Sequence, residues 1–526
     1  MDREQRRRLT PPVVALVALL LASACSSAAP PAAPTQTAQS VSPTEPPATE
    51  TEPAATESEG PVSEATPTPL IITPEPVAIG ESGLTADGKV LIRWFVGLGS
   101  GTNPQQIEAQ QTAVADFNAA QDARTDGGTK ILLQLEIVQN STASDILKTQ
   151  IASGNAPDIV GPVGVRGRNG FNDIFLDLTD QIARTDFDLS GYDEALVEFF
   201  QEGASGQVGI PYAVFPSFIF YNKDLFDEAD LPYPPHAVDE MYDGQPWTWE
   251  ALTELAKKLT VDANGSDATS PDFDPEEIVQ FGFETQYSEP RRQASAWGAG
   301  SYVSEDGRTV EIPDAWRTAW NWYYDAMWSD HFIPTDEYRN SDTFGAGNPT
   351  ASGRVAMAHM FMWYSCCMIP PSGEAAFDSW DIAVMPSHDD TITAPINADT
   401  FTIVETTSHP DEAFEVLTYL LGVPELLVTY GGMPARISEQ PAFFESLDAS
   451  FAEAFPGNDV DWQVALDMQS YPDIPNHEDD VPNFLKVYAL QAEFWTKLNT
   501  TPDLDVDAEI DTYASEIQAL VDQVQP

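Results

Sequence analysis

The sequence predicts an α/β fold in two lobes, and three observations support this prediction. Strand-like apolar runs alternate with helix-like segments from Val90 onward, which is the order expected of a parallel α/β sheet. About 440 residues follow the low-complexity N-terminal region, enough for two lobes with cores of their own. The chain has only three cysteines, so apolar burial rather than a disulfide framework must hold this fold together.

The N-terminus is typical of an export signal. Four arginines in the first eight residues precede an apolar stretch, Val13 to Leu21, that is too short to span a bilayer comfortably. Small residues at 22–24 then lead into Cys25. An ordinary signal peptide would be cut at this A-x-A pattern. We favour a lipoprotein signal, residues 1–24, with Cys25 as the lipid-modified first residue, because cysteine is otherwise rare. Ala22 stands where such signals usually carry leucine.

Residues 25–85 are predicted to be a disordered tether. Proline, threonine, alanine, serine and glutamate dominate this segment, so it cannot bury enough apolar surface to offset the entropy of ordering. Such a chain would span about 45 Å if flexible and up to about 190 Å if stiff and polyproline-like. Several acyl groups on Cys25 would hold the far end of this tether to a membrane.

Composition and motifs exclude several classes of function. The chain has 24 basic and 83 acidic residues, a net charge of −59, which argues against nucleic acid as a partner. No G-x-S-x-G or H-E-x-x-H motif occurs, and the acidic loop at 262–267 lacks the glycine position of a calcium loop. We therefore expect no enzyme activity, no metal and no cofactor.

The folded region begins with a repeating pattern. Strands are expected at 90–97, 130–138 and 157–163, with helices at 104–120 and 144–154 between them. Glycines at 97–101 do not complete a dinucleotide motif, because Thr102 replaces the third glycine. Further helices are expected after Thr248, at 316–323, at 410–421 and at 506–524, and Trp316, Trp320 and Tyr323 are expected in the core because they share one helix face.

Seven segments, in order, resemble a known family. They are GNAPDIV (154–160), GIPYAVFPSFIFYNKDLF (209–226), PWTWEAL (246–252), SGRVAMAHM (352–360), WDIAVMPS (380–387), TFTIVETTSHPDEAFEVLTYLL (400–421) and GGMPARIS (431–438). Together they resemble the extracellular solute-binding proteins of family 1, the maltose-binding-protein-like carbohydrate receptors of ABC importers. Each segment alone is weak evidence for this family, but the seven segments in this order are specific to it.

This resemblance implies a periplasmic-binding-protein-like fold, with two α/β lobes joined by crossing hinge strands and a ligand cleft between them. The solute-binding domain would span 86–526. The first lobe would contain about 86–214 and 395–436, and the second about 215–394 and 437–526. The chain would cross between the lobes near Phe215 and Pro395.

A sugar site needs aromatic faces for the C–H surfaces of the ring and polar groups for its hydroxyls. Trp363 follows the "AM" strand, where the family places a stacking aromatic, although a core position is the alternative. Trp297 lies beside glycines, which suggests a cleft edge. Phe215 stands where relatives often carry a polar ligand-binding residue, and Tyr212 could donate its hydroxyl.

Four polar residues complete the predicted site. Arg166 follows the third strand, Asn397 and Asp399 lie next to the second crossing, and Arg436 follows "GGMP". Each could equally be exposed or ion-paired. Cys366 and Cys367 could form a strained disulfide or stay as thiols. We favour the interpretation that both are small buried side chains.

The resemblance implies a monomeric, lipid-anchored receptor on the outer face of the cytoplasmic membrane. It would deliver a small solute, a sugar or oligosaccharide, to ABC permease subunits. Two alternatives remain: a ligand-sensing partner of a membrane receptor, and a glycan-active envelope enzyme.

Overall fold

The computed structural model describes most of the chain from residue 72 onward. The described ranges are 72–80, 83–99, 104–171, 174–202, 206–285, 289–304, 307–341, 344, 349–368, 375–479 and 481–524, without the side chains of Glu202, Cys366 and Cys367. The predicted signal peptide, Cys25 and most of the predicted tether lie outside these ranges. So do the thiol groups at 366 and 367.

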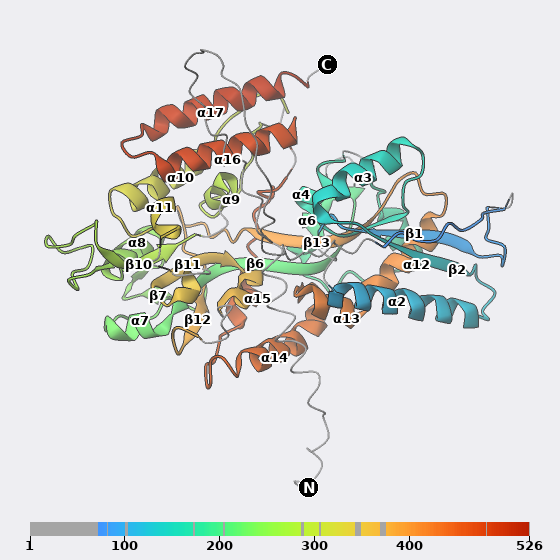
Figure 1. Cartoon of the computed structure of the whole chain (residues 1–526), viewed down its shortest axis with the longest axis horizontal. Coiled ribbons are helices and arrows are strands. Elements are labelled where there is room, and N and C mark those ends of the chain that lie inside the picture. The colour runs from blue at the N-terminus through green and yellow to red at the C-terminus, as the bar shows by residue number, and fades with distance from the viewer. Residues whose placement is uncertain are drawn as a thin grey trace, which may run out of the picture.

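One sheet runs through the whole molecule (Figure 1). Its strand order is β2-β1-β3-β13-β6-β11-β10-β9, and β12 and β14 also pair with β6. The strands are β1 (Val90–Val96), β2 (Ile131–Ile137), β3 (Ile159–Gly164), β6 (Ile210–Asn222), β9 (Val261–Asp262), β10 (Ile278–Glu284), β11 (Val355–Phe361), β12 (Trp380–Ala383), β13 (Ile396–Ile403) and β14 (Met433–Pro434). Two short hairpins, β4 (Gln201–Glu202) with β5 (Gly206–Gln207) and β7 (Met241–Tyr242) with β8 (Gln245–Pro246), lie apart from it.

The long strand β6 changes partners in its middle. Ile210 to Pro216 pair with β13, and Ser217 to Tyr221 pair with β11. All 13 residues of β6 are buried. Elements on either side of this change form two groups, which we call the first lobe (containing β1, β2 and β3) and the second lobe (containing β10, β11 and β12), joined by β6 and β13 (Figure 1).

Helices cover the sheet in both lobes. In the first lobe they are α2 (Pro104–Ala123), α3 (Asn140–Ala152), α4 (Val165–Arg168), α5 (Thr179–Thr185), α6 (Glu194–Phe199), α12 (Pro410–Leu421) and α13 (Pro424–Tyr430). The others are α7 (Lys223–Glu228), α8 (Trp249–Lys258), α9 (Pro290–Ser295), α10 (Asp314–Trp328), α11 (Asp336–Arg339), α14 (Gln440–Phe451), α15 (Gln463–Met468), α16 (Phe484–Thr500) and α17 (Val506–Val521), with short 3-10 turns η3 (Thr350–Ser352), η4 (Met362–Met368) and η5 (Ile437–Glu439).

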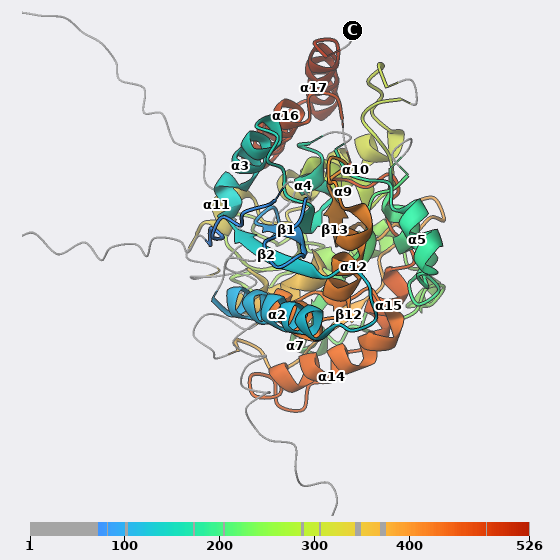
Figure 2. The same ribbon diagram turned by 90° about the vertical axis from the view of Figure 1, so that its right-hand side faces the viewer.

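The first lobe is a sandwich of helices around parallel strands, as the sequence predicts. Strand β1 pairs in parallel with β2 and β3. Trp94 on one face of β1 packs in the cluster that contains Ile107 of α2, whereas Phe95 on the other face packs with Leu147 of α3. Figure 2 shows α3 and α2 on opposite sides of β1 and β2.

The second lobe has an aromatic core. Trp316, Trp320 and Tyr323 of α10 are completely buried, which confirms the helix-face prediction.

Helix α8 begins where the side chain of Thr248 accepts a hydrogen bond from the backbone N–H of Ala251, an N-cap that satisfies an otherwise unpaired donor.

Ordered contacts extend upstream of residue 86, into the predicted tether. Ile72 forms a β-bridge with Ile137, and the Gln134 side chain donates to the carbonyl of Glu75 at 2.7 Å.

Among the described residues no single helix is long and apolar enough to cross a membrane; the bent pair α12 and α13 meets those criteria only when taken together.

Gly282 in β10 allows a close approach to α8. A Cβ atom added at this position would lie 1.9 Å from the carbonyl oxygen of Ala256. We expect Gly282→Ala to lower the free energy of unfolding by about 2 kcal/mol or more, because backbone must move to admit the methyl group.

Urea unfolding followed by circular dichroism measures this effect. Gly422→Ala is the matched control, because its nearest neighbour would be an ordinary 3.5 Å contact, and it should change stability by no more than about 0.5 kcal/mol. Equal effects of the two substitutions would show that the β10–α8 approach is not tight.

Candidate functional site

Side chains from both lobes meet beside the crossing strands. Strand β3 ends at Gly164 and α4 begins with Val165, which places Arg166 and Asn169 at the edge of the first lobe. The second lobe contributes Glu289 and Glu478 opposite them. We call this region the interlobe junction: Arg166, Asn169, Asp399, Tyr430, Glu289, Glu478 and Tyr488.

Asp399 is a partly buried carboxylate of the junction. The Tyr430 hydroxyl donates a hydrogen bond to Oδ2 of Asp399, and a Cβ added at Gly164 would lie 2.7 Å from Oδ1. The pKa of Asp399 is raised to about 6, chiefly by burial and to a smaller extent by Glu478, while the Tyr430 hydrogen bond and Arg168 act in the opposite direction. This carboxyl group can therefore accept hydrogen bonds as an anion or donate one when protonated.

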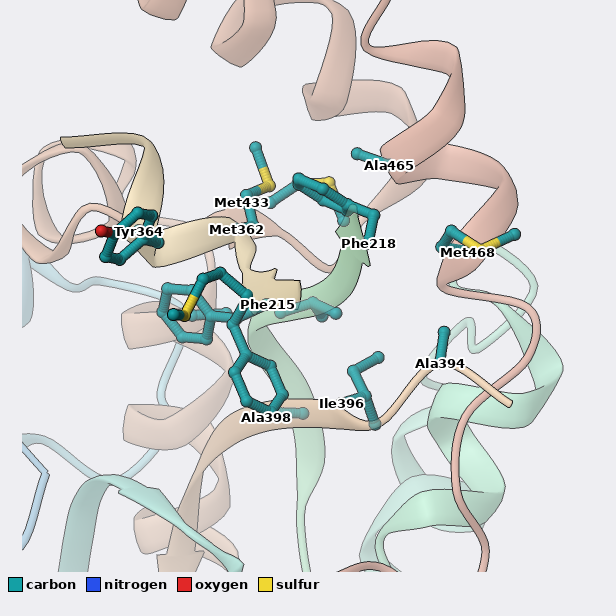
Figure 3. Close-up of a cluster of buried hydrophobic side chains, with 14 of the residues drawn as sticks. Phe215, Phe218, Met362, Tyr364, Ala394, Ile396, Ala398, Met433, Ala465 and Met468 are labelled. Atoms are coloured by element: carbon teal, nitrogen blue, oxygen red, sulfur yellow. The ribbon is translucent and has the colours of Figure 1, made fainter. Parts of the chain in front are cut away.

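Aromatic rings surround Asp399 on the first-lobe side. Tyr430 lies 6.0 Å from Tyr212 and 6.4 Å from Phe215 between ring centroids, and Tyr212 packs 4.8 Å from Phe401. Burial raises the pKa of Tyr212 well above its ordinary value, so this residue keeps its hydroxyl proton. Figure 3 shows the apolar cluster around Phe215, which includes Phe218, Met362 and Met433.

The second lobe presents a stack of planar groups. The Trp363 ring is stacked on Phe361, with centroids 5.9 Å apart and planes 14° from parallel. The Arg292 guanidinium lies 5.0 Å from the centre of the Phe361 ring, and His477 packs 5.7 Å from the same ring. Nδ1 of His477 lies 2.9 Å from Oδ2 of Asp473, which fixes the imidazole in place.

The structure brings five of the predicted site residues to the crossing strands. Phe215 and Asn397 are direct partners in the β6–β13 pairing, and Asp399 pairs with Ala213 two residues further along. Asn397 and Asp399 lie on the same face of β13, because side chains alternate along a strand. Tyr212 lies beside Tyr430, and Arg166 reaches Glu289. Trp363 is half-buried in η4 on the second-lobe side.

Two predicted site residues lie elsewhere. Trp297 is only 3% exposed and stacks on Trp249 with ring centroids 4.9 Å apart, so the expected position at an edge is corrected to the core of the second lobe. Arg436 donates to the Tyr192 hydroxyl at 3.1 Å and lies 3.5 Å from Glu439. The ion-paired alternative therefore describes Arg436.

Sequence reasoning missed Tyr430, Glu289, Glu478 and Tyr488. Tyr430 stands directly before the "GG" segment, which is the one local signal that could have found it. The other three come from separate loops and helices of the second lobe with no shared motif. Among the residues that the structure describes, no group of three or more His, Cys, Asp or Glu side chains could hold a metal ion.

The pKa of Asp399 predicts a pH effect on stability. Its value of about 6 in the folded chain exceeds the ordinary value of 3.8, so the folded state binds this proton more tightly than the unfolded state does. That stabilisation is complete below about pH 4 and is lost as the pH rises through about 6. Asp399→Asn cannot ionise but can still accept from Tyr430.

The variant should therefore gain stability relative to the wild type, by up to about 3 kcal/mol, between pH 4 and pH 7. Chemical unfolding at both pH values measures the difference. Asp411→Asn, a change at an exposed carboxylate of α12, controls for the loss of one negative charge. A constant difference between Asp399→Asn and wild type across this range would contradict the assigned pKa.

Comparisons with known proteins agree with this architecture. A family model described as bacterial extracellular solute-binding protein matches residues 108–424. UspC of M. tuberculosis is 19% identical with a TM-score of 0.62, and the match covers 82% of this chain and 100% of that one. The ABC substrate-binding protein Lmo0181 of Listeria monocytogenes, solved with cycloalternan, is 18% identical with a TM-score of 0.57, over 82% and 98%.

The maltose/maltodextrin-binding domain MalE of Bdellovibrio bacteriovorus, solved with maltotriose, is 17% identical with a TM-score of 0.51, and the match covers 82% of this chain and 99% of that one. Identities this low establish a shared fold. No curated protein matches the chain.

Proposed function

This chain belongs to the bacterial extracellular solute-binding protein family, and on that premise we propose that it is the receptor of an ABC importer for a sugar or oligosaccharide. The family consists of binding subunits rather than enzymes, and its members work outside the cytoplasm. The proposed ligand site is the part of the interlobe junction formed by Asp399 and Tyr430, together with the Trp363–Phe361 stack.

One observation carries this proposal: the two lobes offer complementary chemistry beside the same crossing strands. The first lobe offers Asp399 and Tyr430, which can exchange hydrogen bonds with hydroxyl groups. The second lobe offers the flat face of Trp363, which suits the C–H face of a sugar ring. Two of the solved relatives hold sugars, cycloalternan and maltotriose, and this supports the same ligand class here.

The mechanism would follow from a closing motion about β6 and β13. A solute that touches both walls favours the closed arrangement by its differential affinity for that state. The closed receptor would then dock on permease subunits in the membrane. Lipid attachment at Cys25 and the segment after it would keep the receptor close to its permease and raise its local concentration there.

A thermal-shift screen of the purified protein tests the proposal. Mono- and oligosaccharides, polyols and phosphorylated glycerols are compared at high concentration. A ligand that binds only the native state stabilises it by about 2.7 kcal/mol at a hundredfold excess over its dissociation constant. A shift with one sugar class supports the receptor; stabilisation by glycerol phosphates alone, or by none of the panel, would contradict a sugar ligand.

Trp363→Ala should weaken binding of the sugar found in the screen by about tenfold or more, because the stacking face is lost. Isothermal titration calorimetry measures the affinity. Trp328→Ala removes another half-buried tryptophan, one whose indole N–H donates to the Leu498 carbonyl, and should leave the affinity unchanged. Full affinity in Trp363→Ala would remove this residue from the site.

A further inference from the structure

Arg166 connects the two lobes through its side chain. It belongs to the short helix α4 of the first lobe, yet its guanidinium lies 4.0 Å from the centre of the Tyr488 ring. Nη1 of Arg166 also lies 3.2 Å from Oε1 of Glu289. Glu289 directly precedes α9 and Tyr488 belongs to α16, so both partners are second-lobe residues.

The partners of Arg166 are themselves held in place. The Tyr488 hydroxyl donates to the same Glu289 oxygen that faces Arg166. The backbone N–H of Arg166 donates to Oε2 of Glu478 at 3.3 Å, and the Asn169 side chain donates to the carbonyl of Glu478. The short helix α4 is thus attached to the second lobe through Arg166 near its start and through Asn169 at its C-cap.

All of these contacts are made by groups of the protein itself, and the Arg166 guanidinium is engaged by second-lobe groups. The sequence alone predicted that Arg166 would bind the solute. In the structure, the aromatic face of Tyr488 and the carboxylate of Glu289 instead provide the binding partners of the Arg166 guanidinium. Because Arg166 and its two side-chain partners lie on opposite lobes, separation of the lobes must break all of their contacts.

We propose that Arg166 is a positioning residue that latches the lobes together before solute arrives. The latch populates the closed arrangement in the free protein. Apparent affinity depends on the fraction of molecules that is competent to bind, so the latch tightens solute binding without contacting the solute. The effect on affinity rests on the proposed function, whereas the effect on lobe separation does not.

The test measures lobe separation in the absence of any solute. Spin labels on unnatural residues at the exposed positions Glu108 in α2 and Glu254 in α8 report the distance between the lobes by pulsed electron paramagnetic resonance. We expect one short distance in the wild type and a longer, broader distribution in Arg166→Ala. Arg184→Ala, which removes an ion pair with Asp411 inside the first lobe, should leave the distribution unchanged.

A charge exchange separates a latch from a general loss of structure. Glu289→Arg alone should open the lobes, and Arg166→Glu combined with Glu289→Arg should restore the short distance. Solute affinity in Arg166→Ala should fall about two- to tenfold, the size expected for a half-exposed ion pair and cation–π contact.

An unchanged distance distribution in Arg166→Ala would overturn the latch. If the affinity fell while that distribution stayed unchanged, Arg166 would be a solute contact instead. Failure of every sugar to bind would count against the proposed function alone, because the distance measurement decides the latch without solute.

Discussion

The structure depends on one constraint, the passage of two strands through both lobes. Strand β6 is buried along its entire length and changes partners from β13 to β11 at its middle. Because a single sheet therefore extends through both lobes, the ends of β3 and β11 are held on opposite sides of the crossing. Every group in the interlobe junction takes its position from this shared backbone, although it comes from segments hundreds of residues apart in the sequence.

The junction holds more charge than an apolar core would tolerate, and its geometry shows how this charge is accommodated. Arg166 is matched by Glu289 and by the face of Tyr488, and it stays partly exposed. Asp399 is more deeply enclosed, and the hydroxyl of Tyr430 supplies its hydrogen bond. Groups that are paired between the lobes favour closure, whereas the charge repulsion between the carboxylates of Asp399 and Glu478 opposes it. On the proposed closing motion, a few residues at one edge of the junction would set the balance between open and closed states.

Local sequence patterns were enough to predict elements of the fold, but they were not enough to predict the residues of the site. The spacing of Trp316, Trp320 and Tyr323 located a buried helix face, because that signal is local. The same reasoning misplaced Trp297, since a tryptophan between small residues has the same sequence appearance at a cleft edge and in a core. Glu478 and Tyr488 gave no signal, because only the folded chain places them opposite Arg166. The described contacts of Ile72 came from a segment whose composition resembles a tether.

On the proposed function, solute binds between the lobes and engages both. Hydrogen–deuterium exchange with mass spectrometry, performed with and without a solute that stabilises the protein, shows which segments the solute protects. We expect simultaneous protection of the first-lobe segments 161–169 and 396–403 and of the second-lobe segments 475–479 and 484–490. Protection confined to one lobe, or located away from the crossing strands, would contradict it.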